Sequence, residues 1–191
     1  MKLENKIRIH SKREDVFFAL NNLKVIQASL PGCEKLEKIS DVEMNGSVVA
    51  KIGPVKARFT GTAFLSEIKP PESYVISGEG KGGAAGFAKG KATVKLTEDG
   101  DDTLLSYTVH IEVGGKLAQL GSRLIEGTSK SLAEQFFASF EENITQGERS
   151  INQRSLNSRS QTSTEIRIFS GTSIIWIVLG IIVIVGAIYL Y

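Results

Sequence analysis

The chain has 191 residues, with 23 basic and 21 acidic side chains and a formal net charge of +2. The excess lies within residues 148–170, where four arginines accompany two glutamates, so the other 19 basic and 19 acidic side chains balance. A balanced globular part lacks the basic footprint of a nucleic-acid-binding domain, so we expect no nucleic-acid partner. Cys33 is the only cysteine. A single cysteine cannot form a disulfide within the chain, and this agrees with a reducing compartment.

Residues 1–145 have the length of one domain with a sizeable core. Apolar residues alternate from Leu3 to Ile9, which predicts a strand. Two short helices are expected next, the first burying Val16 and Leu20 and the second ending at Pro31-Gly32.

Alternating apolar residues then predict a series of antiparallel strands between glycine and proline turns. The strands are expected over residues 48–52, 55–65, 74–76, 88–96 and 105–113. Because the apolar residues fall on one side of each strand, one face of the sheet should be buried. We interpret Gly78–Gly90 as two bulged strands and their turn, since glycine within a strand often marks a bulge.

After Gly114-Gly115 the apolar period lengthens to three and four residues, from Leu117 to Ile144. This spacing predicts one long amphipathic helix of about 45 Å. The simplest α+β arrangement that buries both apolar surfaces is a curved antiparallel sheet that grips this helix.

The C-terminal part differs in composition from residues 1–145. Residues 146–173 are rich in Ser, Thr, Asn, Gln and Arg without apolar periodicity, which predicts a flexible polar linker. Residues 174–191 carry no charge, and as a helix they would span about 27 Å, close to the hydrocarbon core of a bilayer. We predict a single transmembrane helix, a tail anchor, that holds the globular domain in the cytoplasm at the cytoplasmic membrane. The alternative is a buried core helix, which would normally keep a polar stripe.

Several short motifs occur in a fixed order along residues 1–145. They are Leu30–Cys33, Lys51–Val55, Phe59–Gly61, Gly78–Gly83, Gly86–Gly90 and Gly115–Ile125. Together they resemble the CoxG family of carbon monoxide dehydrogenase subunits, within the START-like (SRPBCC) helix-grip superfamily. The resemblance implies a helix-grip fold and an accessory protein that tethers a molybdenum hydroxylase, such as aerobic carbon monoxide dehydrogenase, at the cytoplasmic membrane.

We expect no catalytic residue and no metal site. His10 and His110 have no ligand residue at metal-binding spacing, and no base can be named for Cys33. The glycine-rich run lacks the lysine and the following helix of a phosphate-binding loop.

The resemblance also implies a hydrophobic ligand between sheet and helix. Small residues are expected along the inner side of the sheet, at Ala57, Gly61, Ala63, Ala88, Gly90 and Ala92. Large helix side chains either interdigitate with them in a filled core or leave an open apolar pocket. The predicted lining comprises Phe59, Gly61, Ala63, Leu65, Phe87, Ala92, Tyr107, Val109, Leu120, Leu124, Phe136 and Phe140.

We interpret the chain as a non-catalytic, membrane-anchored subunit that recruits the hydroxylase and carries a quinone-like ligand, with no covalent cofactor. Its partners would be the bilayer, the hydroxylase and the quinone. Gly82 and Gly83, with Lys81 and Lys89, are the predicted partner surface. The alternatives are a lipid-binding or lipid-transfer protein, and an enzyme of the cyclase or hydrolase type, for which Tyr107 is the one inward ionisable candidate.

Overall fold

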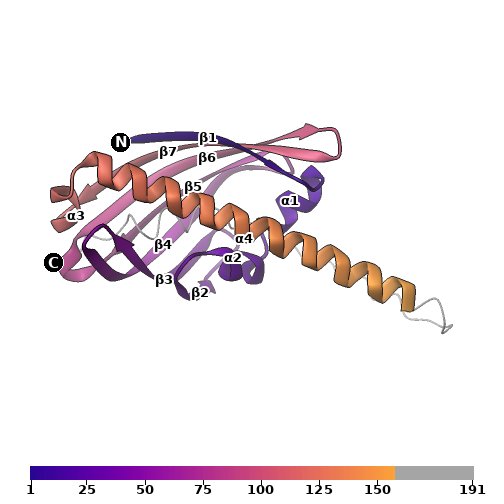
Figure 1. Ribbon diagram of the computed structural model, residues 1–191, viewed down its shortest axis with the longest axis horizontal. Coiled ribbons are helices and arrows are strands. Elements are labelled where there is room, and N and C mark those ends of the chain that lie inside the picture. Colours follow the sequence, from indigo (N-terminus) through magenta and orange to yellow (C-terminus); the bar gives the residue numbers. More distant parts are fainter. Residues whose placement is uncertain (158–191) are drawn as a thin grey trace.

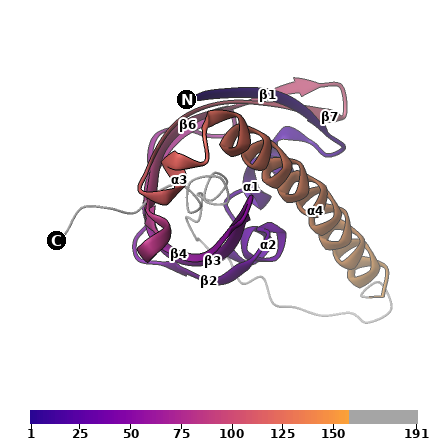
Figure 2. The same cartoon turned by 60° about the vertical axis from the view of Figure 1, so that its left-hand side comes forward.

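The computed structural model describes the backbone of residues 1–157 and the side chains of residues 1–145. A curved seven-stranded sheet surrounds one side of a long C-terminal helix, α4, as Figures 1 and 2 show. Across the sheet the strands follow the order β1-β7-β6-β5-β4-β3-β2, and every neighbouring pair is antiparallel. The expected sheet gripping a helix is confirmed for these residues.

The strands correspond to the predicted alternating segments, with one addition. They are β1 (Lys2–Ile9), β2 (Cys33–Lys38), β3 (Glu43–Ile52), β4 (Val55–Lys69), β5 (Ser73–Lys81), β6 (Phe87–Asp99) and β7 (Asp102–Gly114). The helices are α1 (Arg13–Ala19), α2 (Leu23–Ser29), the single 3₁₀ turn η1 (Gly83–Ala85), α3 (Lys116–Gln119) and α4 (Ser122–Asn157). The sequence pattern missed β2, whose only buried residue is Leu36, because an edge strand with one apolar contact shows no alternation.

The sheet has two ends that matter for function. At the α3 end lie the turns at residues 53–54, 82–86, 114–115 and 120–121. At the α1 end lie helix α1 and the hairpin turns at residues 39–42, 70–72 and 100–101. Figure 1 shows α3 and the N-terminus of the chain at one end of the sheet and α1 at the other, where α4 runs out past the sheet.

Helix α4 is held mainly through α2. The side-chain amide of Asn143 donates to the Ser29 hydroxyl at 3.0 Å. Phe140 and Ile144 on α4 are buried in the same core as Ile26 of α2. The burial of apolar side chains such as these is the main favourable contribution to folding.

The predicted single helix after Gly114-Gly115 is wrong in one respect. It is divided into α3 and α4 by Leu120 and Gly121, and Gly121 has φ +82°. A residue with this backbone angle ends a helix, and glycine adopts it without the steric cost of a Cβ atom. The break rotates the start of α4, so that Ile125 is buried while Leu124 is 38% exposed.

The predicted bulges within Gly78–Gly90 are also wrong. Strands β5 and β6 pair in continuous register from Ser73↔Lys95 to Lys81↔Phe87. Register shifts occur between Cys33 and Lys35 in β2 and between Ser66 and Lys69 in β4. The glycines allow close packing instead, as described below.

Helix α4 extends to Asn157, beyond the predicted end of the domain at residue 145. Residues 148–157 contain glutamate, arginine and glutamine, which favour helix, and no proline. The rest of the predicted linker and the predicted transmembrane segment, 158–191, lie outside the described residues. Within residues 1–157 no helix combines the length and apolar character needed to cross a bilayer.

Candidate functional site

The inner, concave face of the sheet carries a continuous patch of small residues. In one row across the strands, Gly46, Gly61, Gly80 and Ala88 are successive partners. The next row places Ala63, Gly78 and Gly90 side by side, and Ala92 follows opposite Ile76. The structure therefore brings together five of the six small residues that the alternation predicted, whereas Ala57 pairs with Ala50 nearer the β3–β4 turn.

Gly78 and Gly80 also belong to this patch, although they fall within the run read as bulged strands. They share the inner face with Tyr74 and Ile76, which are buried at 2% and 0% exposure. Because side chains alternate along a strand, the period-two continuation from Ile76 could have placed both glycines inward.

The glycines permit contacts that a side chain would block. A Cβ atom on Gly61 would lie 2.6 Å from the Cα atom of Gly80 on the neighbouring strand. A Cβ atom on Gly82 would meet the ring of Phe59, at 2.9 Å from Cδ1. On Gly114 it would collide with the ring of Phe87. Close approach, rather than bulging, explains these positions.

Opposite the small residues stands an aromatic cluster. Phe136 and Phe140 stack with ring centroids 5.7 Å apart, and Phe137 meets Phe136 edge-to-face at 5.1 Å. Tyr107 of β7 stacks on Phe137 at 5.8 Å. Phe137 was not among the predicted lining residues, because it stands one position off the assumed helix stripe.

The remaining predicted lining residues divide into three groups by burial. Those buried in the same core are Phe59, Ala63, Leu65, Ala92 and Val109. Leu120 and Phe87 are half-buried, and Phe87 lies against Gly114. Leu124 lies apart, exposed on α4 and resting on Gly53.

Three buried polar atoms of the described residues lack a hydrogen-bond partner; one is Arg13 Nε of α1, and the other two belong to residues that contact Phe17. The Tyr74 hydroxyl and the Asn21 side-chain oxygen are buried and have no hydrogen-bond partner among the described residues. Both residues contact Phe17: the Tyr74 ring edge-to-face at 6.1 Å, and Asn21 through its amide to the Phe17 carbonyl. Burial raises the pKa of Tyr74 well above its ordinary value, so the hydroxyl stays protonated. Burial also raises the pKa of Tyr107.

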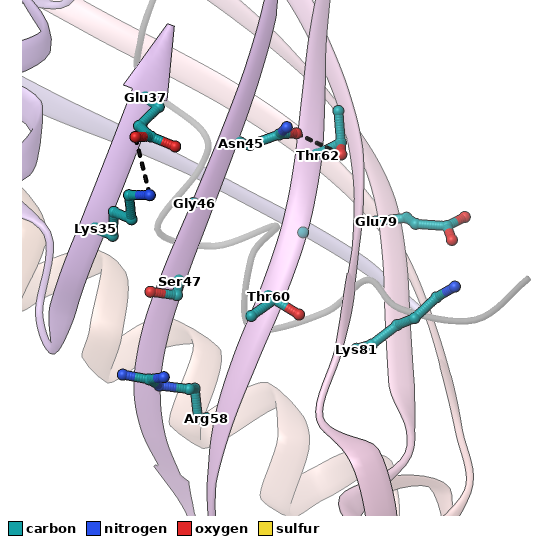
Figure 3. Close-up of a pocket in the computed structure, with 11 residues that line it drawn as sticks. Lys35, Glu37, Asn45, Gly46, Ser47, Arg58, Thr60, Thr62, Glu79 and Lys81 are labelled. Carbon is teal, nitrogen blue, oxygen red and sulfur yellow. Dashed lines mark hydrogen bonds and ion pairs between the residues drawn. The ribbon is translucent and has the colours of Figure 1, made fainter. Parts of the chain in front are cut away.

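The outer, convex face is polar. A depression of about 560 Å³ crosses strands β2 to β5 there, as Figure 3 shows. Its side chains include Lys35, Glu37, Asn45, Ser47, Arg58, Thr60, Thr62, Glu79 and Lys81. Lys35 pairs with Glu37 at 2.9 Å and the Thr62 hydroxyl donates to Asn45 at 2.7 Å. This surface differs in place and in polarity from the predicted apolar pocket.

The residues of the predicted partner surface lie in two separate places. Lys89 forms an ion pair with Glu112 at 2.9 Å, whereas Lys81 is exposed at the end of β5. Gly82 and Gly83 form the turn between β5 and β6, and Gly83 has φ +56° with open space around it. Lys81, Gly82 and Gly83 therefore lie at the α3 end, where Lys81 also lines the outer depression, and Lys89 lies farther along the outer face.

The titratable residues considered for chemistry are separate from one another. His10 Nδ1 lies 2.5 Å from a Glu141 carboxylate oxygen, and His110 is exposed on β7. Cys33 is half-buried, and burial raises the pKa of its thiol, which disfavours the reactive thiolate. Among residues 1–145, no cluster of three or more His, Cys, Asp or Glu side chains is arranged to hold a metal ion.

The fold defines the class of protein. A conserved protein from Geobacillus kaustophilus is 28% identical, with a TM-score of 0.73 over 76% of this chain and 96% of that chain. A START superfamily protein from Mycobacterium smegmatis, 11% identical, has a TM-score of 0.62 over 76% and 97%. The Zhui aromatase/cyclase from Streptomyces, also 11% identical, has a TM-score of 0.57 over 85% and 99%. The fold is the START-like helix-grip fold.

The sequence profile of the carbon monoxide dehydrogenase CoxG subunit matches residues 6–145. The chain belongs to the CoxG family of carbon monoxide dehydrogenase subunits, as its motifs predicted. A comparison with curated proteins gives no match. Family membership associates the chain with carbon monoxide dehydrogenase.

Proposed function

We propose that this protein is a non-catalytic accessory protein that attaches to the cytoplasmic membrane, recruits a molybdenum hydroxylase of the carbon monoxide dehydrogenase type, and carries a quinone-like ligand. The observation that carries the proposal is the family match over residues 6–145. The apolar segment 174–191 supports membrane attachment through its length and lack of charge.

The ligand part of the proposal rests on the inner face of the sheet. Small residues such as Gly61, Gly78 and Gly90 stand on the face that α4 covers with aromatic side chains. Such a surface suits a flat apolar molecule, and a quinone is flat, apolar and soluble in the bilayer. The protein would supply burial and orientation, while the redox chemistry would belong to the quinone.

Two experiments test the proposal. In the first, the full chain is purified from membranes with a mild detergent, and its lipids are extracted and identified by mass spectrometry. Recovery of about one quinone per protein is expected. Recovery of phospholipid alone would favour the lipid-transfer alternative.

In the second experiment, vesicles carrying the full chain are floated with the hydroxylase complex. The hydroxylase should float with vesicles that carry the chain and sediment with bare vesicles. A chain without residues 174–191 should leave the vesicles. If it stays bound after a salt wash, the tail-anchor prediction is wrong.

A test for an open cavity requires a substitution that does not disturb the backbone of the sheet. Ala92 is buried on the inner face opposite Val109 and Ile76. Ala92→Phe should remove the ligand with little loss of stability if the space is open. In a filled core the same change should cost about 1–3 kcal/mol.

A further inference from the structure

The globular domain has no net charge, but its charged side chains are distributed unevenly between the two ends of the sheet. At the α3 end, residues 50–57, 80–88 and 113–124 contain five cations and no acidic residue. These are Lys51, Lys56, Lys81, Lys116 and Arg123. At the α1 end, residues 39–43, 69–73 and 98–103 contain seven carboxylates and one cation. The connection at residues 10–15 adds two acidic residues, a lysine and an arginine, so the difference between the ends is unchanged.

The five cations of the α3 end are exposed and have no carboxylate partner among the described residues. Lys51 and Lys56 are register partners across the β3–β4 turn, where like charges oppose each other. Several other cations of the domain are paired with carboxylates, as Arg58 is with Glu34 at 2.5 Å, whereas single lysines such as Lys6 and Lys95 are exposed without such a pair in the described part of the chain. The α3 end therefore concentrates positive potential that is free to act on a partner.

An apolar side chain lies among these cations. Leu124 is 38% exposed, and its Cδ2 atom is only 2.6 Å from the position of a Cβ atom on Gly53. It lines a depression of about 470 Å³ together with Lys51 and Arg123. A central apolar residue with a charged rim is typical of the anatomy of protein–protein interfaces.

The direction of the chain shows which way this surface faces. Helix α4 starts at the α3 end and leaves past the α1 end (Figure 1), a length of about 54 Å for its 36 residues. The residues that lead to the predicted membrane segment therefore depart from the acidic end. The basic end is the one farther from Asn157, the last described residue of α4.

We propose that the α3 end, where Leu124 lies beside Lys51 and Arg123 and where α3 adds Lys116, is the surface on which an acidic face of the hydroxylase docks. This inference rests on the proposed function and names the surface that performs it. Charge complementarity would act mainly on the association rate, and burial of Leu124 would prolong the complex.

The test uses the full chain in phosphatidylcholine vesicles and the molybdenum hydroxylase of the same organism as the probe. The variant Lys51→Glu/Lys116→Glu/Arg123→Glu reverses three charges of the α3 end. The matched control, Lys6→Glu/Lys24→Glu/Lys95→Glu, reverses three exposed lysines elsewhere on the domain. Association rates are measured at 20 and 150 mM salt, and circular dichroism verifies that each variant is folded.

The reversal at the α3 end should slow association at least tenfold at low salt, and the control should change it less than twofold. The neutral variant Lys51→Gln/Lys116→Gln/Arg123→Gln should give a smaller loss, and Leu124→Ser should speed dissociation without changing the salt dependence. Equal effects of the reversal and its control would overturn the inference.

Two further results separate the remaining explanations. A loss that occurs only when the vesicles contain phosphatidylglycerol would assign the α3 end to lipid and overturn the inference. If the unmodified chain fails to bind the hydroxylase, the proposed function itself fails, and the docking surface with it.

Discussion

The two faces of the sheet follow different rules. On the inner face, glycines and alanines bring strands and rings so close that even one added methyl group collides with a neighbour, as at Gly61. On the outer face, the side chains are exposed and pair locally, as Lys35 does with Glu37. Close packing therefore determines how the inner face contributes to stability. The outer face contributes through charge interactions, which solvent weakens. Equivalent substitutions should have very different costs on the two faces.

The largest expected effect is the loss of an inner aromatic ring. Phe140 is fully buried and stacks on Phe136, so Phe140→Ala should lower the free energy of unfolding by about 3–5 kcal/mol. Phe64, 46% exposed on the other face, is the matched control, and Phe64→Ala should cost less than about 1 kcal/mol. Urea unfolding followed by circular dichroism measures both. Similar costs would contradict the contrast between the faces.

A smaller effect is expected from adding a methyl group at a glycine. Gly61→Ala would place a Cβ atom against the backbone of β5, and overpacking of this kind should cost about 1–3 kcal/mol. Gly127 of α4 has open space around it, so Gly127→Ala should instead stabilise the protein by about 1 kcal/mol through helix propensity. If Gly61→Ala proves neutral in thermal unfolding, the strands are farther apart than described.

The sequence predicted which strand residues face the core better than it predicted which residues contact one another. Period-two alternation identified six of the seven strands and assigned residues such as Ala63 and Val109 to the buried face. The pairing of Gly82 with the Phe59 ring depends on strand register between distant segments, which local periodicity does not contain. The exposure of Leu124 depends on the break at Gly121. A continuous helix would have continued the stripe from Leu117 through that residue.

The separation of charge between the α1 and α3 ends was likewise hidden in the sequence. The basic and acidic side chains of residues 1–145 balance, so their net charge suggests no electrostatic bias. Each strand runs from one end of the sheet to the other, so residues of the two ends alternate along the sequence. Only the topology gathers Lys51, Lys81 and Lys116 at one end. The balanced composition led us to expect no nucleic-acid partner, but it said nothing of where a protein partner would dock.

An intermediate case is a polar group on the inner face. The Tyr74 hydroxyl is buried without a hydrogen-bond partner among the described residues, and leaving such a group unpaired costs about 1–3 kcal/mol. Tyr74→Phe keeps the ring contact with Phe17 and removes the hydroxyl, so the free energy of unfolding should stay equal or rise by up to about 1 kcal/mol. A loss above about 1 kcal/mol would mean that the hydroxyl is hydrogen-bonded in solution, to water or to the polar group of a ligand.

The smallest effect should come from an exposed ion pair, and it should depend on pH. The hydrogen bond and the negative charge of Glu141 raise the pKa of His10, because the folded state favours the protonated imidazole. The stabilisation is therefore complete below the ordinary histidine pKa and is lost as pH rises through the raised value. Glu141→Gln should lower stability more at pH 5.5 than at pH 8.5, and high salt should reduce the difference because the pair is exposed.

A double-mutant cycle with His10→Gln isolates the pair from other effects of each substitution. The coupling should be measurable at pH 5.5 and should fall toward zero at pH 8.5. His110→Gln removes the other histidine, which lies on β7 rather than beside α4, and should give no coupling with Glu141. A coupling that grows as the pH rises would reverse the sign argued here. It would mean that the neutral imidazole is the form that Glu141 stabilises.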